Sequence, residues 1–246
     1  MGGAGAADCG VALAPLTCLV HLDRAAGDVL ARLETGDLDA PVPGCPGWRL
    51  TDLAHHLGGI HRWAHGAVVH GKPQERTVAG PADRAALVDW FRAGAAELVA
   101  TLRTTDPGTP CWTFGPKPRT AAFWFRRQTH ETVLHAYDAA ASQGVTTPIT
   151  PMLALDGIDE VVTMFLPRQI ELGRTAPPPV SLALEPDEGG RWVLTGDDPA
   201  PAATVTGPAE AVLLLLWHRV GLDDPRLAVA GSRAAADAML AIALTP

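Results

Sequence analysis

The sequence predicts an α+β protein with an N-terminal four-helix bundle (residues 1–148) and a small C-terminal α+β domain (residues 149–246). Three observations support this fold class. Four long segments before residue 144 carry apolar residues at helical spacing, short apolar runs typical of strands follow after residue 179, and the stretch 144–151 between them contains glycine and proline. With 246 residues, 47% of them hydrophobic, the chain can bury the cores of two modest domains.

The first two predicted helices flank a segment that cannot be helical. Apolar residues over positions 16–36 follow one face of a helix. Residues 39–48 then contain three prolines and two glycines, which exclude a helix and predict a structured loop that Trp48 pins to the core. The second helix, residues 51–71, is expected to begin with Thr51 as its N-cap.

Two more helices complete the predicted bundle. The third is expected to begin at Pro81 and to carry an apolar face as far as Leu102. After a loop over residues 104–118, the fourth spans roughly residues 120–144. Helical bundles build metal and ligand sites from side chains that face the bundle interior, so a site is expected there.

The C-terminal part is predicted to mix helices and strands. Residues 186–190 have the composition of a hairpin connection between two strands. The expected helices are residues 153–172, 208–217 and 232–244, and the expected strands are residues 180–184, 191–194 and 203–206. These elements predict a small α+β domain.

Composition excludes several classes of function. The formal net charge is −8 and lysine and arginine form no patch, which disfavours binding to nucleic acid or to an anionic membrane. The four cysteines form no CxxC pair, so zinc-ribbon and thioredoxin-type sites are not expected. No signal peptide or transmembrane helix is expected, and we predict a cytoplasmic protein.

The residue pair Glu131 and His135 predicts a metal site. The two lie four residues apart on a predicted helix, which places both side chains on one face, one turn apart. A third ligand from another helix would give two histidines and one glutamate, a set that binds catalytic zinc and leaves one coordination position open. The second predicted helix supplies five of the nine histidines: His55, His56, His61, His65 and His70. Any one of them alone more often has a packing or surface role, and not all can be ligands.

Three groups of residues resemble the mycothiol-dependent maleylpyruvate isomerase family, whose N-terminal half has the DinB-like four-helix fold. The first group is Val42–Trp48 with His56–Trp63, the second is Trp112–Phe114, Trp124–Arg127 and His130–Asp138, and the third is Val205–Ala209 with Leu213–Trp217 and Arg219. The resemblance spans nearly the whole chain. It also implies an actinobacterial source, in keeping with a composition typical of a GC-rich genome.

The resemblance implies a specific set of site residues. His56, Glu131 and His135 match the family's metal ligands, with His56 chosen over its neighbour His55 because it directly precedes Leu57-Gly58-Gly59. The metal would be Zn²⁺ or another divalent ion such as Ni²⁺. Arg219 matches an arginine that faces the active site of the isomerase. The chain departs from the family pattern at His218 and at Gly231-Ser232, near the expected substrate side.

The implied reaction uses mycothiol, or a similar low-molecular-weight thiol, as a metal-activated nucleophile. The thiolate would drive the cis–trans isomerisation of a small electrophile, or become joined to that electrophile in an S-transfer reaction. Arg219, with Arg126 or Arg127, would pair with carboxylates of the substrate. The chain's own cysteines are not expected to act as nucleophiles, and Cys45 and Cys111 are interpreted as packing thiols. Asp138 is interpreted as a solvated helix residue rather than a partner of His135.

Two alternative functions are also compatible with the sequence. One is a metal-dependent hydrolase of the DinB-like superfamily, in which water rather than a thiol occupies the open position. The other is a non-catalytic small-molecule-binding protein on the same scaffold, which would need no stoichiometric metal. Both a monomer and a homodimer are compatible with the sequence.

Overall fold

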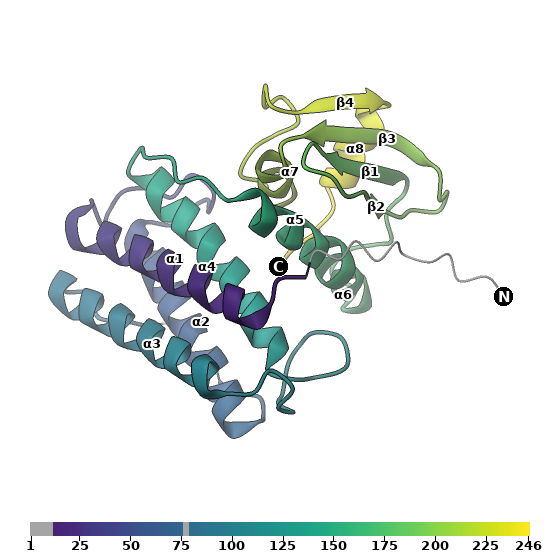
Figure 1. Cartoon of the computed structure of the whole chain (residues 1–246). Coiled ribbons are helices and arrows are strands. Elements are labelled where there is room, and N and C mark those ends of the chain that lie inside the picture. The colour runs from purple at the N-terminus through teal and green to yellow at the C-terminus, as the bar shows by residue number, and fades with distance from the viewer. Residues whose placement is uncertain (1–11, 76–78) are drawn as a thin grey trace. The chain divides into compact units, whose positions relative to one another are not determined.

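The computed structural model describes residues 12–75 and 79–246 and divides into two compact units, Leu13–Pro148 and Ile149–Pro246. The first unit contains four long helices, α1 (Pro15–Thr35), α2 (Leu50–His70), α3 (Arg84–Thr104) and α4 (Ala122–Ser142). Figure 1 shows these helices side by side, with α1 packed on α3 and α4, and α2 packed on the same two helices. The predicted four-helix architecture is therefore confirmed.

The helix starts differ from the sequence prediction by one to three residues because other residues cap them. Helix α2 begins at Leu50, and the carboxylate of Asp52 accepts the backbone N–H of Arg49 at 2.8 Å. Thr51 is not the N-cap, since its hydroxyl donates to the carbonyl oxygen of Leu38 instead. Helix α3 begins after Asp83, whose side chain accepts the N–H of Ala86 and so satisfies a donor that the first helical turn leaves open.

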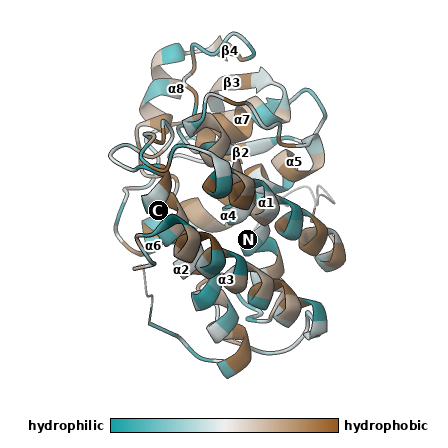
Figure 2. Cartoon of the chain, turned by 90° about the vertical axis from the view of Figure 1, so that its left-hand side faces the viewer, coloured by the Kyte–Doolittle hydropathy of each residue, from teal (hydrophilic) through white to brown (hydrophobic). Residues whose placement is uncertain are grey.

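The core of the bundle is built from the apolar stripes of its helices. Leu33 of α1, Leu53 and Leu57 of α2 and Phe91 of α3 have no exposed surface and belong to one cluster. Figure 2 shows apolar and polar positions alternating along these helices, as expected for helices with one face in a core and the other in water. The same cluster includes Ala136 and Ala139 of α4, so it joins α2 and α4, the two helices that carry the predicted metal ligands.

The loop before α2 is held by backbone hydrogen bonds. The N–H of Val42 donates to the carbonyl oxygen of Trp48 at 2.9 Å, and the N–H groups of Cys45 and Trp48 complete tight turns within the loop. Gly47 has a φ of 85°, a conformation that favours glycine. Val42 is buried in the core cluster, and Cys45 and Trp48 pack against that cluster half-buried, which confirms that the loop is structured and anchored by Trp48.

The second unit is the small α+β domain. Its sheet has the strand order β2-β1-β3-β4, formed by β1 (Ser181–Pro186), β2 (Trp192–Leu194), β3 (Pro201–Gly207) and β4 (Ala228–Gly231). Strand β1 pairs antiparallel with β2 and parallel with β3, and β3 pairs antiparallel with β4. The predicted hairpin between β1 and β2 is confirmed.

Helices cover this sheet and complete the unit. Helices α7 (Ala209–Leu216) and α8 (Arg233–Leu240) both pack on β1 and β3. The predicted helix 153–172 is a continuous helical run, with α5 (Pro151–Glu160), a π-helical turn η1 (Val161–Phe165) and α6 (Leu166–Glu171). Strand β4 was not predicted, because it is four residues long and mostly exposed, and therefore lacks an apolar alternation. Within the described residues, no helix combines the length and apolar character needed to cross a membrane.

Candidate metal centre

Three of the predicted site residues meet between two helices of the bundle. His56 comes from α2, and Glu131 and His135 come from successive turns of α4. Atom Nε2 of His56 lies 3.1 Å from Oε1 of Glu131, and Nε2 of His135 lies 3.5 Å from the same oxygen. The three candidate ligand atoms all lie within 4.8 Å of one another. Both imidazoles thus point toward one carboxylate oxygen. They meet there because of how α2 and α4 pack, which the sequence pattern alone does not specify.

Arg127 determines which oxygen of Glu131 faces the histidines. Its guanidinium donates to Oε2 of Glu131 at 2.7 Å, and the arginine side chain is only 3% exposed. Burial opposes ionisation of Glu131, but hydrogen bonds with His135 and His56 and the charge of Arg127 outweigh it and hold its pKa well below the usual range. The structure gives Arg127 an ion pair with Glu131, and its pairing with a substrate carboxylate stays a prediction.

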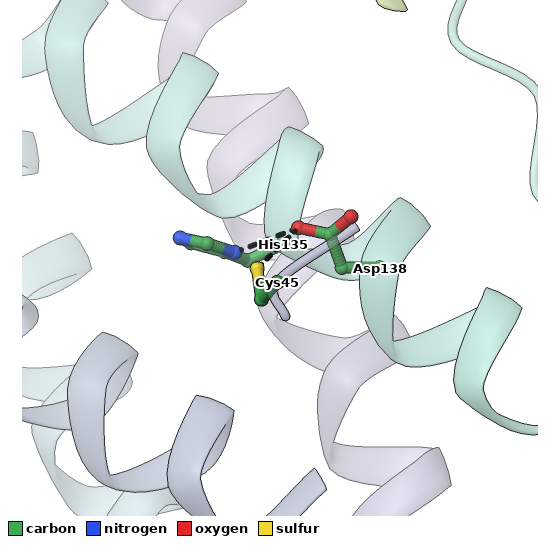
Figure 3. Close-up of side chains that lie close together, drawn as sticks. All are labelled: Cys45, His135 and Asp138. Atoms are coloured by element: carbon green, nitrogen blue, oxygen red, sulfur yellow. Dashed lines mark hydrogen bonds and ion pairs between the residues drawn. The ribbon is translucent and has the colours of Figure 1, made fainter. Parts of the chain in front are cut away.

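His135 is held from its other ring nitrogen. Its Nδ1–H donates to Oδ2 of Asp138 at 3.0 Å, and the Cys45 thiol donates to the same oxygen with Sγ at 3.6 Å (Figure 3). Burial lowers the pKa of His135, but its hydrogen bonds with Asp138, Cys45 and Glu131 outweigh burial and raise the pKa well above the usual value.

The interpretation of Asp138 as a solvated residue is wrong. Its side chain has no exposed surface. It follows His135 by three residues, so both project from the same face of α4, and the packing of the bundle turns that face inward. That i, i+3 spacing was visible in the sequence and was the one signal that favoured a contact.

Trp48 forms a wall of the site. Its ring lies 4.9 Å from the ring of His56, tilted by 52°, and 6.2 Å from the ring of His135 in a stacked arrangement. The loop before α2 therefore contributes two residues to the site, Trp48 against the imidazoles and Cys45 against Asp138. Sequence reasoning assigned both to packing and missed this second role, because proximity to α4 depends on how the loop folds.

The other histidines of α2 lie elsewhere. His55 contacts the carbonyl oxygen of Pro81 at 3.0 Å, and His65 contacts Thr101 and Glu97 on α3. His61 has no exposed surface and its Nε2 lies 2.9 Å from the hydroxyl oxygen of Thr132. Among residues 12–75 and 79–246, the two groups of three potential ligands are His56–Glu131–His135 and Cys45–His135–Asp138.

Arg219, the predicted catalytic residue of the C-terminal domain, lies three residues beyond the end of α7. Its guanidinium donates to the carbonyl oxygen of Trp217 at 2.7 Å, and its backbone N–H donates to Leu214. The preceding residue, His218, has a φ of 57°, which reverses the chain after the helix. Arg219 is thus held by its own turn, and its catalytic role stays a prediction.

The donor set and its spacing fit a divalent metal. Zinc binds imidazole nitrogen and carboxylate oxygen at about 2.1 Å, so neighbouring ligand atoms of a tetrahedral site lie about 3.4 Å apart. The two separations from Oε1 of Glu131 are 3.1 and 3.5 Å. These two separations are close to that value, and all three ligand atoms lie within 4.8 Å of one another. Two histidines and one carboxylate also leave a fourth position for another ligand.

Comparison with known proteins agrees with the resemblance seen in the sequence. The family model "Mycothiol maleylpyruvate isomerase N-terminal domain" matches residues 19–140, and "MDMPI C-terminal domain" matches residues 152–238. No curated protein matches the chain.

Two solved structures share the fold. The crystal structure of the mycothiol-dependent maleylpyruvate isomerase aligns with a TM-score of 0.64 and that of a histidine-to-alanine mutant of the enzyme with 0.60. Each is 14% identical in sequence, and each alignment covers 89% of this chain and 95% of the other. With family models matching both halves of the sequence, the chain belongs to the mycothiol-dependent maleylpyruvate isomerase family.

Proposed function

We propose that this protein is a metal-dependent enzyme that uses mycothiol as its nucleophile to isomerise a small electrophile from cis to trans. The observation that carries the proposal is the meeting of His56, Glu131 and His135 at separations suited to a divalent metal. Zn²⁺ is the expected ion, with Ni²⁺ as a second candidate for the same donors. Family membership supports the thiol and the reaction class.

The charges around the site favour an anionic ligand in the open position. With a divalent ion bound, both imidazoles would be neutral ligands, and together with the carboxylates of Glu131 and Asp138 and the cation of Arg127 the cluster would carry a formal charge of +1. A thiolate ligand would bring it to zero. Because charge that is buried without compensation is unfavourable, the site favours a thiolate over a neutral thiol.

A free thiol, with a pKa of about 8.5, is mostly protonated at neutral pH. A bound divalent ion would activate the thiol by stabilising its thiolate form. The protein's own residues do the rest. Glu131 is kept ionised by its hydrogen bonds with His135 and His56 and by the charge of Arg127, and the ring of Trp48 packs beside both imidazoles.

The reaction then follows from reversible addition. The mycothiol sulfur adds to one carbon of a cis double bond conjugated to a carbonyl, and the electron pair of that double bond moves onto the carbonyl group. Rotation about the new single bond and expulsion of the thiolate give the trans product and return the thiol unchanged. Arg219 is proposed to bind a carboxylate of the substrate, for which a guanidinium is suited. If the adduct is released instead of reverting, the same site performs S-transfer.

Metal analysis tests the site first. Purified wild-type protein should contain one divalent metal ion per chain, and Glu131→Ala should lose it. Glu97→Ala is the matched control, because Glu97 is a helical glutamate of the same unit that contacts His65 rather than the cluster. Metal-free wild-type protein that is also unaffected by chelators would overturn the proposal and favour a non-catalytic binding protein.

Thiol dependence tests the reaction. Zinc-loaded protein should convert maleylpyruvate, or a related cis-enoic diacid, only when mycothiol is present, and the Arg219→Gln variant should raise KM without losing metal. Turnover at the same rate with and without mycothiol would contradict the proposal and favour a metal-dependent hydrolase. Accumulation of a mycothiol adduct without isomerised product would identify S-transfer as the reaction.

A further inference from the structure

The carboxylate of Asp138 makes contacts that the proposed metal chemistry does not by itself require. Oδ2 of Asp138 accepts hydrogen bonds from Nδ1 of His135 at 3.0 Å and from Sγ of Cys45 at 3.6 Å, and the side chain is fully buried (Figure 3). Removing a carboxylate from water is unfavourable, and partners offset this only in part. The position of Asp138 therefore suggests a role other than stability.

The contact with Asp138 decides which nitrogen of His135 is available as a ligand. A carboxylate only accepts hydrogen bonds, so the Nδ1 atom that faces it must carry a proton. A neutral imidazole then has its lone pair on Nε2. This is the atom that lies 3.5 Å from Oε1 of Glu131, inside the candidate metal site.

The geometry of α4 makes this arrangement rigid. Glu131, His135 and Asp138 follow one another at intervals of four and three residues, so all three project from one face of a continuous helix. The ring of His135 is held at Nδ1 by a residue of its own helix, and it cannot turn about χ2 without breaking that bond. Fixing a ligand in this way lowers the entropy lost when it binds a metal.

Cys45 is the second donor to the same carboxylate oxygen of Asp138. Its backbone N–H donates to Val42 at 3.0 Å and its carbonyl oxygen accepts from Trp48 at 3.0 Å, so the loop fixes the position of the thiol. The thiol reaches Asp138 across 93 positions of sequence. Two donors on one carboxylate oxygen restrict its rotation more than one donor would.

The same three residues do not suit a second metal ion. Cys45, His135 and Asp138 have ligand atoms close enough together to form a cluster. However, a second ion there would bind His135 through Nδ1 while Nε2 serves the first site. Such a ring would have to lose both of its N–H protons, and the hydrogen bond to Asp138 would be lost.

We propose that Asp138, steadied by Cys45, is a positioning residue that orients His135 and presents its Nε2 atom to the metal. The inference rests on the proposed metal site of His56, Glu131 and His135. It adds a residue that touches neither metal nor substrate and acts through His135 alone.

The test is the zinc affinity of Asp138→Asn, measured by competition with a chromogenic chelator. Loss of such a partner typically weakens metal binding by about 10- to 100-fold, and we expect a loss in this range. Asp156→Asn is the matched control, because Asp156 is an equally buried aspartate of the C-terminal unit. It should bind zinc as tightly as the wild type. Equal affinity in Asp138→Asn and the wild type would overturn the inference.

Two spectroscopic readouts separate orientation from general stability. The visible absorption of Co²⁺ bound to Asp138→Asn should differ from that of the wild type, whereas a purely structural role would leave the spectrum of the folded protein unchanged. In zinc-loaded wild-type protein, ¹⁵N–¹H correlation should find the His135 proton on Nδ1, a measurement that needs no variant. A proton on Nε2 would refute the proposal. If the wild type binds no zinc at all, the proposed function itself fails.

Discussion

His61 gives the sharpest prediction of stability against pH. Its ring has no exposed surface, Nε2 contacts the hydroxyl of Thr132, and Nδ1 has no hydrogen-bond partner among the described residues. Burial lowers the pKa of His61 to about 3, and the nearby charge of Glu131 opposes this only in part. The folded protein therefore keeps this histidine neutral at pH values where the unfolded chain, with a pKa near 6.5, takes up a proton.

The sign and size of the effect follow from proton linkage. Because the unfolded state binds the extra proton, stability falls as the pH drops below about 6.5 and continues to fall until the folded-state pKa is reached. Each pH unit in that window is worth about 1.4 kcal/mol, so the free energy of unfolding should fall by about 2 kcal/mol between pH 7.5 and pH 5. Above pH 7.5 His61 should contribute no pH dependence.

The assay is urea unfolding of metal-free protein at pH 7.5 and pH 5.0, for wild type and His61→Gln. The variant has no titrating group at this position and should lose about 2 kcal/mol less than the wild type over the same interval. His70→Gln is the control, since His70 is exposed at the end of α2, and it should follow the wild type. Identical pH dependence in wild type and His61→Gln would refute the reasoning, because it would mean that the buried ring is protonated in the folded state.

Three further predictions concern the site and its scaffold. Binding of Co²⁺ or Ni²⁺ should quench tryptophan fluorescence through Trp48, which lies against both imidazoles, and Trp48→Phe should remove most of that quenching. Arg127→Met should lower the free energy of unfolding by about 3 kcal/mol, because it removes the guanidinium that pairs with Oε2 of the buried Glu131 carboxylate, and zinc should restore part of the loss in urea unfolding. Asp83→Ala should lower stability by about 1 kcal/mol through loss of the α3 cap, and an unchanged zinc affinity in chelator competition would show that the effect is confined to the helix.

Local patterns in the sequence determined the elements of the fold. Apolar residues at helical spacing predicted the four long helices, because each must bury one face, and glycine and proline located the breaks between them. Spacing also placed Glu131 and His135 on one face of α4. The starts of α2 and α3 were less certain, since several polar residues near each start can cap the helix and the fold selects one of them.

The family motif pointed to His56 as the third ligand, but only the tertiary structure shows how it and the other residues surround that pair. His55 and His56 are adjacent in sequence, and it is the packing of α2 on α4 that turns His56 toward Glu131 and leaves His55 beside Pro81. Cys45 reaches Asp138 because the loop before α2 folds back on the core. These contacts join segments far apart along the chain, and no local pattern encodes them. The sequence by itself therefore determined the ligand types and the helices that carry them, while packing decided which side chains converge and which nitrogen of His135 faces the site.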